Sequence, residues 1–178
     1  GTKAEDLTRA EIALAGTVRR WLHNIRTMPG FEDSFLLDCP TIGVRETRHF
    51  EGEYTLRVED MLEGREFPDS IVLASHPVDI QPRPSWMEAE KDAYPTRWFF
   101  RIPYRILVPR KVEALLLAGR CISATHEASG SIRPTVQCMI TGEAAGTAAA
   151  LCAQQDHMPR TLPVKRLHDV LRERGVRF

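Results

Sequence analysis

The chain carries helix-like hydrophobic patterns near both ends. Close to the N-terminus, apolar residues recur every three or four positions and predict a helix with one buried face: Leu14, Val18, Trp21, Leu22 and Ile25. Thr8 and Glu11 have the spacing of a capping box, and "MPG" at 28–30 predicts the end of this helix. Two more helices are predicted, one from about 135 to 154 and a last one that starts near 161–163 and ends at Gly175.

Between these helices the pattern changes to alternating or continuous apolar runs. A short helix is predicted at 60–66, and 80–97, with three prolines and no sustained period, is predicted to be a surface excursion. The segments predicted to be strands are 31–60 (broken by turns), 71–75, 98–108 and 113–119, the last being the most apolar.

This order of elements predicts an α/β or α+β fold. We expect three parts: an N-terminal helix (1–30), a β-rich region (31–108) and a strand–helix unit with a terminal helix (109–178). Parallel sheets are built from several βαβ units, and only one such unit is visible here. The 113–119 strand is therefore expected to join a sheet whose other strands lie outside this chain, or come from only a few of its short β segments.

Composition and charge exclude some classes of function. The 178 residues include 24 basic and 24 acidic side chains, so there is no electrostatic case for nucleic acid or an anionic membrane as partner. No apolar run approaches the roughly 20 residues that span a bilayer. The polar N-terminus does not resemble a signal peptide. Four cysteines without a CxxC pair indicate reduced thiols and a cytoplasmic location.

The segment after the 113–119 strand has the features of an anion site. Gly119 allows close approach of a ligand to the backbone, and Arg120 places a positive charge at the end of the strand. The helix that begins near Thr135 offers free backbone N–H groups and the positive end of its dipole. The pattern is also compatible with a simple turn glycine and a surface arginine.

The long helix is built mostly of small residues. Gly142 and Gly146 each cost roughly 1 kcal/mol of helix stability relative to alanine. We therefore expect a second backbone or a cofactor to crowd this helix, the alternative being close packing on a sheet. On this hypothesis Gly146→Leu is severely destabilising.

Several motifs in order resemble one known family. "IGVRETRHFEGEYTL", "MLEGREFPDSI", "HPVDI", "IPYRILVP", "LLLAGRCISATHEASGSIR" and "CMITGEAAGTAAAL" resemble the C-terminal part of FAD-dependent oxidoreductases of the glutathione-reductase-like class. The resemblance covers nearly the whole chain. It implies that the chain contributes part of an FAD-binding domain, with the β-rich region facing a small-molecule substrate.

The resemblance also implies the cofactor-facing residues. Three of them would face the ribityl and pyrophosphate region: Gly119, Arg120 and Cys121. Five would lie at the pyrimidine end of the flavin: Ile132, Arg133, Pro134, Thr135 and Val136. A helix dipole and an arginine at these places would stabilise a negatively charged reduced flavin.

One principal motif of that family is missing. No GxGxxG sequence, which would hold the ADP part of FAD, occurs in the chain. We therefore expect the C-terminal portion of a longer enzyme, whose N-terminal FAD-binding segment is the natural partner of this chain. Alone, the chain is expected to bind FAD weakly or not at all and to self-associate as a homo-oligomer. The alternative is a non-catalytic binding or scaffold domain that keeps the fold without the cofactor.

Three residues are candidates for catalysis. His76, after a strand and before a proline, could act as an acid or base, or could be a structural histidine. Arg45 and Arg105 could orient an anionic substrate, or could form ion pairs within the β-rich region. No metal site is expected, because His76 and Asp79 lack further ligands at suitable spacing.

Overall fold

The computed structural model describes residues 3–39, 41–46, 48–80 and 98–178. The chain divides into two compact units, Gly1–Arg48 and His49–Phe178. The surface excursion expected at 80–97 lies almost entirely outside the described residues. The part boundaries expected at 30 and 108 stay predictions.

The N-terminal unit is built on the helix α1 (Ala4–Ile25). The helix was expected, but the capping box is wrong: Thr8 lies inside the helix, and its hydroxyl donates to the Ala4 carbonyl at 3.0 Å. The expected buried face is also wrong, because no residue of α1 is buried and the Trp21 side chain is 68% exposed. Among the described residues of its own unit, α1 has only the segment that follows it as a packing partner, which is too little to cover an apolar face.

The second unit contains a two-stranded antiparallel sheet of β1 (Ser70–Ala74) and β2 (Phe100–Pro103). The two strands are joined in a register that pairs Val72 with Ile102 and Ala74 with Phe100. The C-terminal segment joins the sheet through a bond of 2.8 Å from the Leu73 amide to the Arg177 carbonyl. The fold is thus mixed helix and sheet, as expected.

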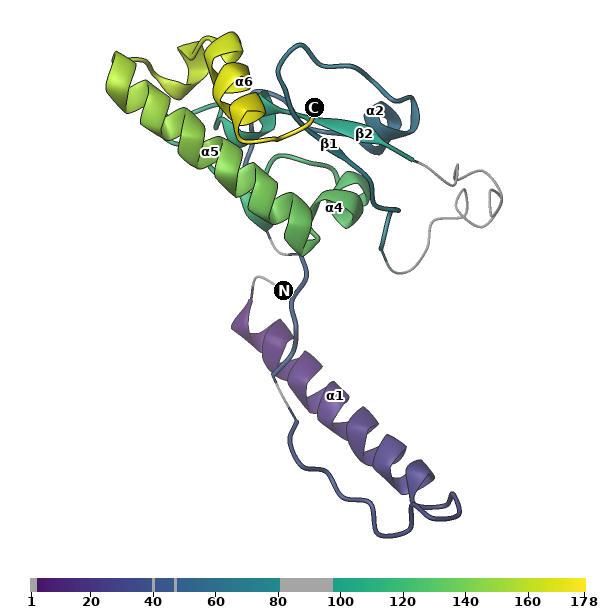
Figure 1. Ribbon diagram of the computed structural model, residues 1–178. Coiled ribbons are helices and arrows are strands. Elements are labelled where there is room, and N and C mark those ends of the chain that lie inside the picture. Colours follow the sequence, from purple (N-terminus) through teal and green to yellow (C-terminus); the bar gives the residue numbers. More distant parts are fainter. Residues whose placement is uncertain (1–2, 40, 47, 81–97) are drawn as a thin grey trace. The chain divides into compact units, whose positions relative to one another are not determined.

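In the described part of this unit, four α-helices accompany the sheet: α2 (Val58–Leu62), α4 (His126–Ile132), α5 (Thr135–Gln155) and α6 (Val164–Glu173). Helix α5 packs against both β1 and α6, and α2 packs against β2 (Figure 1). The predictions of α5 and α6 are confirmed, and α2 begins two residues earlier than expected.

Helix α4 was missed, because its sequence was expected to form a polar loop. It forms because Thr125 is an effective N-cap, whose hydroxyl accepts a hydrogen bond from the Ala128 amide.

The expected buried strand at 113–119 does not form. Leu115 is 39% exposed, and the residues after it are half-buried. The Leu117 amide bonds to the Leu107 carbonyl at 3.0 Å, and no strand ladder is built on this segment among the described residues. A strand requires a neighbour along its whole length, and here only this single bond is made. The described residues also contain three short 3₁₀ turns: η1 (Tyr104–Leu107), η2 (Gly119–Cys121) and η3 (Pro159–Thr161).

The core of the second unit is a single cluster of apolar side chains. Its fully buried members include Leu56, Met61, Ile71, Phe100, Ile102, Ile106, Leu107, Ile122, Ile132, Leu167 and Leu171. None of the helices in the described segments is long and apolar enough to span a bilayer.

Candidate functional site

The glycine turn η2 is hydrogen-bonded to helix α5. Gly119 has a φ of +78°, a conformation that favours glycine, and its amide donates to the Thr141 hydroxyl at 3.3 Å. The Thr141 hydroxyl donates in turn to the Gln137 carbonyl at 2.9 Å. Thr141 is fully buried, so this chain of bonds fixes the turn against the second turn of α5. The structure therefore brings together two segments that the sequence analysis assigned to one site.

Arg120 and Cys121 follow Gly119 in the same turn. Arg120 is exposed, whereas Cys121 is half-buried and its thiol contacts the Ala118 carbonyl at 3.5 Å. Burial raises the pKa of the Cys138 thiol, and the charge of Arg120 acts in the opposite direction. The guanidinium therefore lies within electrostatic reach of the first turn of α5.

The junction between α4 and α5 holds three of the predicted cofactor residues. The Ile132 side chain is buried in the core. Arg133 is the C-cap of α4, and its Nη2 donates to the carbonyl of Asp79 at 2.6 Å and to its carboxylate at 3.0 Å. Pro134 is the N-cap of α5. Arg133 therefore anchors the start of α5 through Asp79, rather than pointing its charge away from the protein.

The start of α5 is suited to an electron-rich group. Pro134 has no side-chain acceptor and makes no capping bond to the first turn, and Thr135 and Val136 are exposed. Gln137 is buried, and its Oε1 has no hydrogen-bond partner in the described part of the chain. The first amides of a 21-residue helix thus lie at the surface at the positive end of its dipole.

Among the described residues no second backbone crowds α5 at its glycines, so that half of the expectation is wrong, whereas crowding by a cofactor stays a prediction. A Cβ atom placed on Gly142 or Gly146 would have no described atom within 4 Å, apart from its chain neighbours and the nearby backbone of its own helix. Both glycines lie on an exposed face that also carries Val136 and Met139, and the Met139 side chain is 69% exposed. The small residues leave this face low, and it carries the charged Glu143 beside its apolar side chains instead of fitting against a described backbone of the same unit.

The three catalytic candidates lie in different surroundings. His76 is half-buried after β1, and its Nδ1 lies 2.7 Å from the Pro77 carbonyl. Arg45 is exposed and belongs to the N-terminal unit. Arg105 forms a two-pronged ion pair with Asp69, at 2.9 Å through Nε and 3.1 Å through Nη2. For Arg105 the structure therefore contains the ion pair that was one of its two expected roles.

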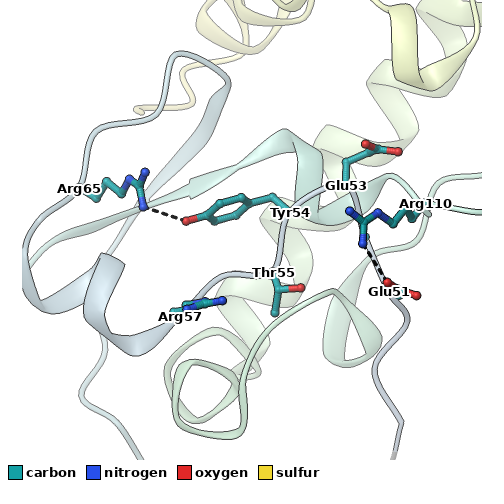
Figure 2. A pocket seen from close by; sticks show the side chains of 8 residues that line it. Glu51, Glu53, Tyr54, Thr55, Arg57, Arg65 and Arg110 are labelled. Atoms are coloured by element: carbon teal, nitrogen blue, oxygen red, sulfur yellow. Dashed lines mark hydrogen bonds and ion pairs between the residues drawn. The ribbon is translucent and has the colours of Figure 1, made fainter.

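A polar pocket of about 400 Å³, which the sequence analysis missed, opens on the second unit (Figure 2). It is lined by Glu51, Gly52, Glu53, Tyr54, Thr55, Arg57, Arg65 and Arg110. One signal for it was present in the sequence. From Thr55 to Arg57 the chain alternates, with Thr55 and Arg57 lining the pocket and Leu56 in the core.

One buried carboxylate, that of Asp60, contacts residues that line the pocket. Asp60 is 5% exposed and accepts bonds from the Tyr54 hydroxyl, the Arg57 amide and Arg65 Nη1. Burial raises the pKa of Asp60, but these hydrogen bonds lower it by more, so its pKa lies below the ordinary value. Asp60 is therefore ionised at neutral pH and holds Tyr54 and Arg65 in place.

The pocket and the glycine turn share a backbone frame. The Phe50 amide donates to the Cys121 carbonyl at 3.1 Å, and the Leu56 amide donates to the Ser123 carbonyl at 3.0 Å. The hydroxyls of Thr55 and Ser123 lie 3.0 Å apart. The strand-like segment that carries the pocket is thus bonded to the residues that directly follow the turn.

In the described residues, no group of three or more His, Cys, Asp or Glu side chains is arranged to hold a metal ion.

These features, a glycine turn fixed to an uncapped helix start and a polar pocket beside it, are typical of an enzyme domain that uses an anionic cofactor. The family described as FAD dependent oxidoreductase matches residues 1–171, and the chain belongs to this family. Membership implies the use of FAD in flavin-linked redox chemistry. A comparison with curated proteins found no match, and neither did a comparison with solved structures.

Proposed function

We propose that this chain forms the flavin-side wall of an enzyme that moves hydride or electrons between an organic small molecule and FAD. The observation that carries the proposal is the bond between the Gly119 amide and Thr141, which fixes the glycine turn beside the uncapped start of α5. This bond supports the proposal, because it joins the glycine turn to the helix whose first residues the family resemblance assigns to the cofactor.

In this proposal each residue has a defined role. FAD, when bound, supplies the two-electron redox chemistry. Gly119 lets the backbone approach the cofactor closely, and Arg120 contributes a positive charge beside it. The exposed amides at the start of α5 stabilise negative charge. Arg133, held by Asp79, sets the position of these amides.

We further propose that the chain is the C-terminal portion of an enzyme of the glutathione-reductase-like class. No two glycines of this sequence are two residues apart, so the GxGxxG turn that holds the ADP part of FAD must be supplied by another segment. The exposed apolar side chains of Val136 and Met139 on α5 support this division, because another protein segment could bury them. A cytoplasmic location and a homo-oligomer remain part of the proposal.

The test is to replace Arg120 by alanine in the flavin-loaded enzyme. We expect less bound flavin per protein, measured by visible absorbance, and a lower flavin reduction potential, because a positive charge beside the reduced cofactor is lost. Arg166→Ala is the matched control, since Arg166 is an exposed arginine of α6. Unchanged flavin content together with an unchanged potential would remove Arg120 from the site.

The alternative, a scaffold domain without cofactor, has its own readout. An enzyme that is isolated without flavin and shows no quenching of added FAD fluorescence would support the scaffold function and contradict the oxidoreductase proposal.

A further inference from the structure

We propose that the pocket shown in Figure 2 binds a carboxylate group of the substrate, with Arg57 as the residue that recognises it. Calling the ligand a substrate rests on the proposed function. The binding of a carboxylate rests on the charges of the pocket alone and can be tested without flavin.

Most charges in the pocket are already neutralised by a partner. Arg110 lies 3.0 Å from Glu51, and Lys111 lies 3.3 Å from the same carboxylate. These two cations lower the pKa of Glu51, which therefore stays ionised and paired at neutral pH. The other lining carboxylate, Glu53, forms an ion pair with Arg160.

Arg65 is paired as well, but only with part of its guanidinium. Its Nη1 donates to Asp60 at 2.7 Å and to the Tyr54 hydroxyl at 3.1 Å. Both of these bonds use the same nitrogen, and the side chain remains 54% exposed. Arg65 can therefore give a second ligand its remaining donors without leaving Asp60.

Arg57 is the uncompensated cation of the pocket. Its side chain is exposed, and among the residues that the structure describes it forms no ion pair. Its backbone is nevertheless fixed, because its amide donates to the buried Asp60 carboxylate at 3.0 Å at the N-cap of α2. An arginine with a fixed backbone and an unused guanidinium is suited to bind an anion from solution.

The pairing of charges favours a ligand with one negative charge. Glu51 and Glu53 are paired with basic side chains and Arg65 is paired with Asp60, which leaves Arg57 as the lining cation that no carboxylate offsets among the described residues. A carboxylate matches this charge and also the planar fork of a guanidinium, whereas a doubly charged phosphate would need a second free cation. The Thr55 hydroxyl lies beside the opening and offers a further hydrogen bond (Figure 2).

The position of the pocket fits a substrate site. Thr55 contacts Ser123 at 3.0 Å, two residues after Cys121 of the glycine turn. A carboxylate held at Arg57 would therefore anchor one end of a molecule close to the proposed flavin wall.

The experiment measures butyrate binding at neutral pH to protein labelled with ¹⁵N-arginine. We expect saturable shifts of the Arg57 and Arg65 side-chain Nε–H signals with butyrate, and none with the neutral n-butanol. Arg57→Gln should weaken butyrate binding about tenfold or more, which corresponds to ~1.4 kcal/mol or more. Arg57→Lys should give an intermediate affinity, because it keeps the charge but loses the fork. Arg166→Gln is the control and should bind butyrate like the wild type.

Three results would overturn the inference: equal butyrate affinity of Arg57→Gln and the wild type, no saturable shift of the Arg57 signal, or tighter binding of inorganic phosphate than of butyrate. If Arg57→Gln fails to fold, Arg57→Lys decides, since wild-type affinity in that variant would contradict recognition by the fork. Failure here leaves the flavin content of the Arg120→Ala enzyme unaffected, so this inference and the proposed function fail separately.

Discussion

Gly130 of α4 is the position where the structure sets the sharpest limit on side-chain size. A Cβ atom there would lie 2.8 Å from Ile80 Cγ2, 3.0 Å from the Asp79 amide nitrogen and 3.3 Å from the Asp79 carbonyl carbon. Two of these three atoms belong to the backbone and cannot rotate away. Gly130→Ala should therefore force α4 apart from the segment at 79–80.

The size of the effect follows from two opposing terms. Alanine gains up to about 1 kcal/mol over glycine inside a helix. Overpacking a close contact costs about 1–3 kcal/mol, and the backbone contact at Asp79 places Gly130→Ala in the upper part of that range. We expect a net loss of roughly 1–2 kcal/mol. Gly146→Ala is the matched control: apart from its chain neighbours and the nearby backbone of its own helix, no described atom lies within 4 Å of a Cβ placed there, so only the gain remains.

The assay is urea unfolding followed by far-UV circular dichroism. The midpoint should fall for Gly130→Ala and rise slightly for Gly146→Ala, with the slope unchanged for both. If Gly130→Ala proves as stable as the control variant, the contact between α4 and Asp79 is not the tight one described. A lower unfolding midpoint of Gly146→Ala than of the wild type would instead indicate that another group crowds α5 at this position.

Further expectations concern pH and buried charge. Burial raises the pKa of Asp60, but its hydrogen bonds, chiefly the one from Arg65, lower this pKa by more. The stability that the ionised carboxylate contributes is therefore present above about pH 4 and is lost on further acidification. Asp60→Asn should flatten that part of a profile of unfolding free energy against pH. Burial lowers the pKa of His168 more than its bond to a backbone carbonyl raises it, so the folded state favours the neutral ring. The free energy of unfolding should therefore decrease as the pH falls below about 6.5. A melting temperature that does not change between pH 7 and 5.5 would contradict this. Arg105→Gln should cost about 1–2 kcal/mol in urea unfolding, because it removes two bonds from Asp69 while the exposed half of the arginine limits the effect.

The sequence predicted the helices better than the strands, for identifiable reasons. Helices α5 and α6 satisfy their own backbone hydrogen bonds, so periodicity and the glycine at 175 were sufficient. The 113–119 segment was predicted as a strand from its apolar run, which does not report whether a neighbouring strand is available to pair with it. Helix α4 was missed because the capping role of Thr125 was not considered, although its spacing to Ala128 was visible.

The candidate site was predictable only where it is local in sequence. The turn at Gly119 and the start of α5 were both identified, but the bond to Thr141 that joins them was not, since it depends on tertiary packing. The pocket was missed for the same reason. Its arginines at 57, 65 and 110 come from three separate segments, and no spacing rule connects them.

The frame around the pocket is held by main-chain bonds, such as those from the Phe50 and Leu56 amides to the carbonyls of Cys121 and Ser123. Such bonds do not depend on which side chains the segment carries. The outward positions at 55 and 57 can therefore be randomised in a protein library with little loss of foldable members, whereas the inward position of Leu56 cannot. This separation makes the pocket a natural starting point for redirecting the enzyme toward other molecules by laboratory evolution.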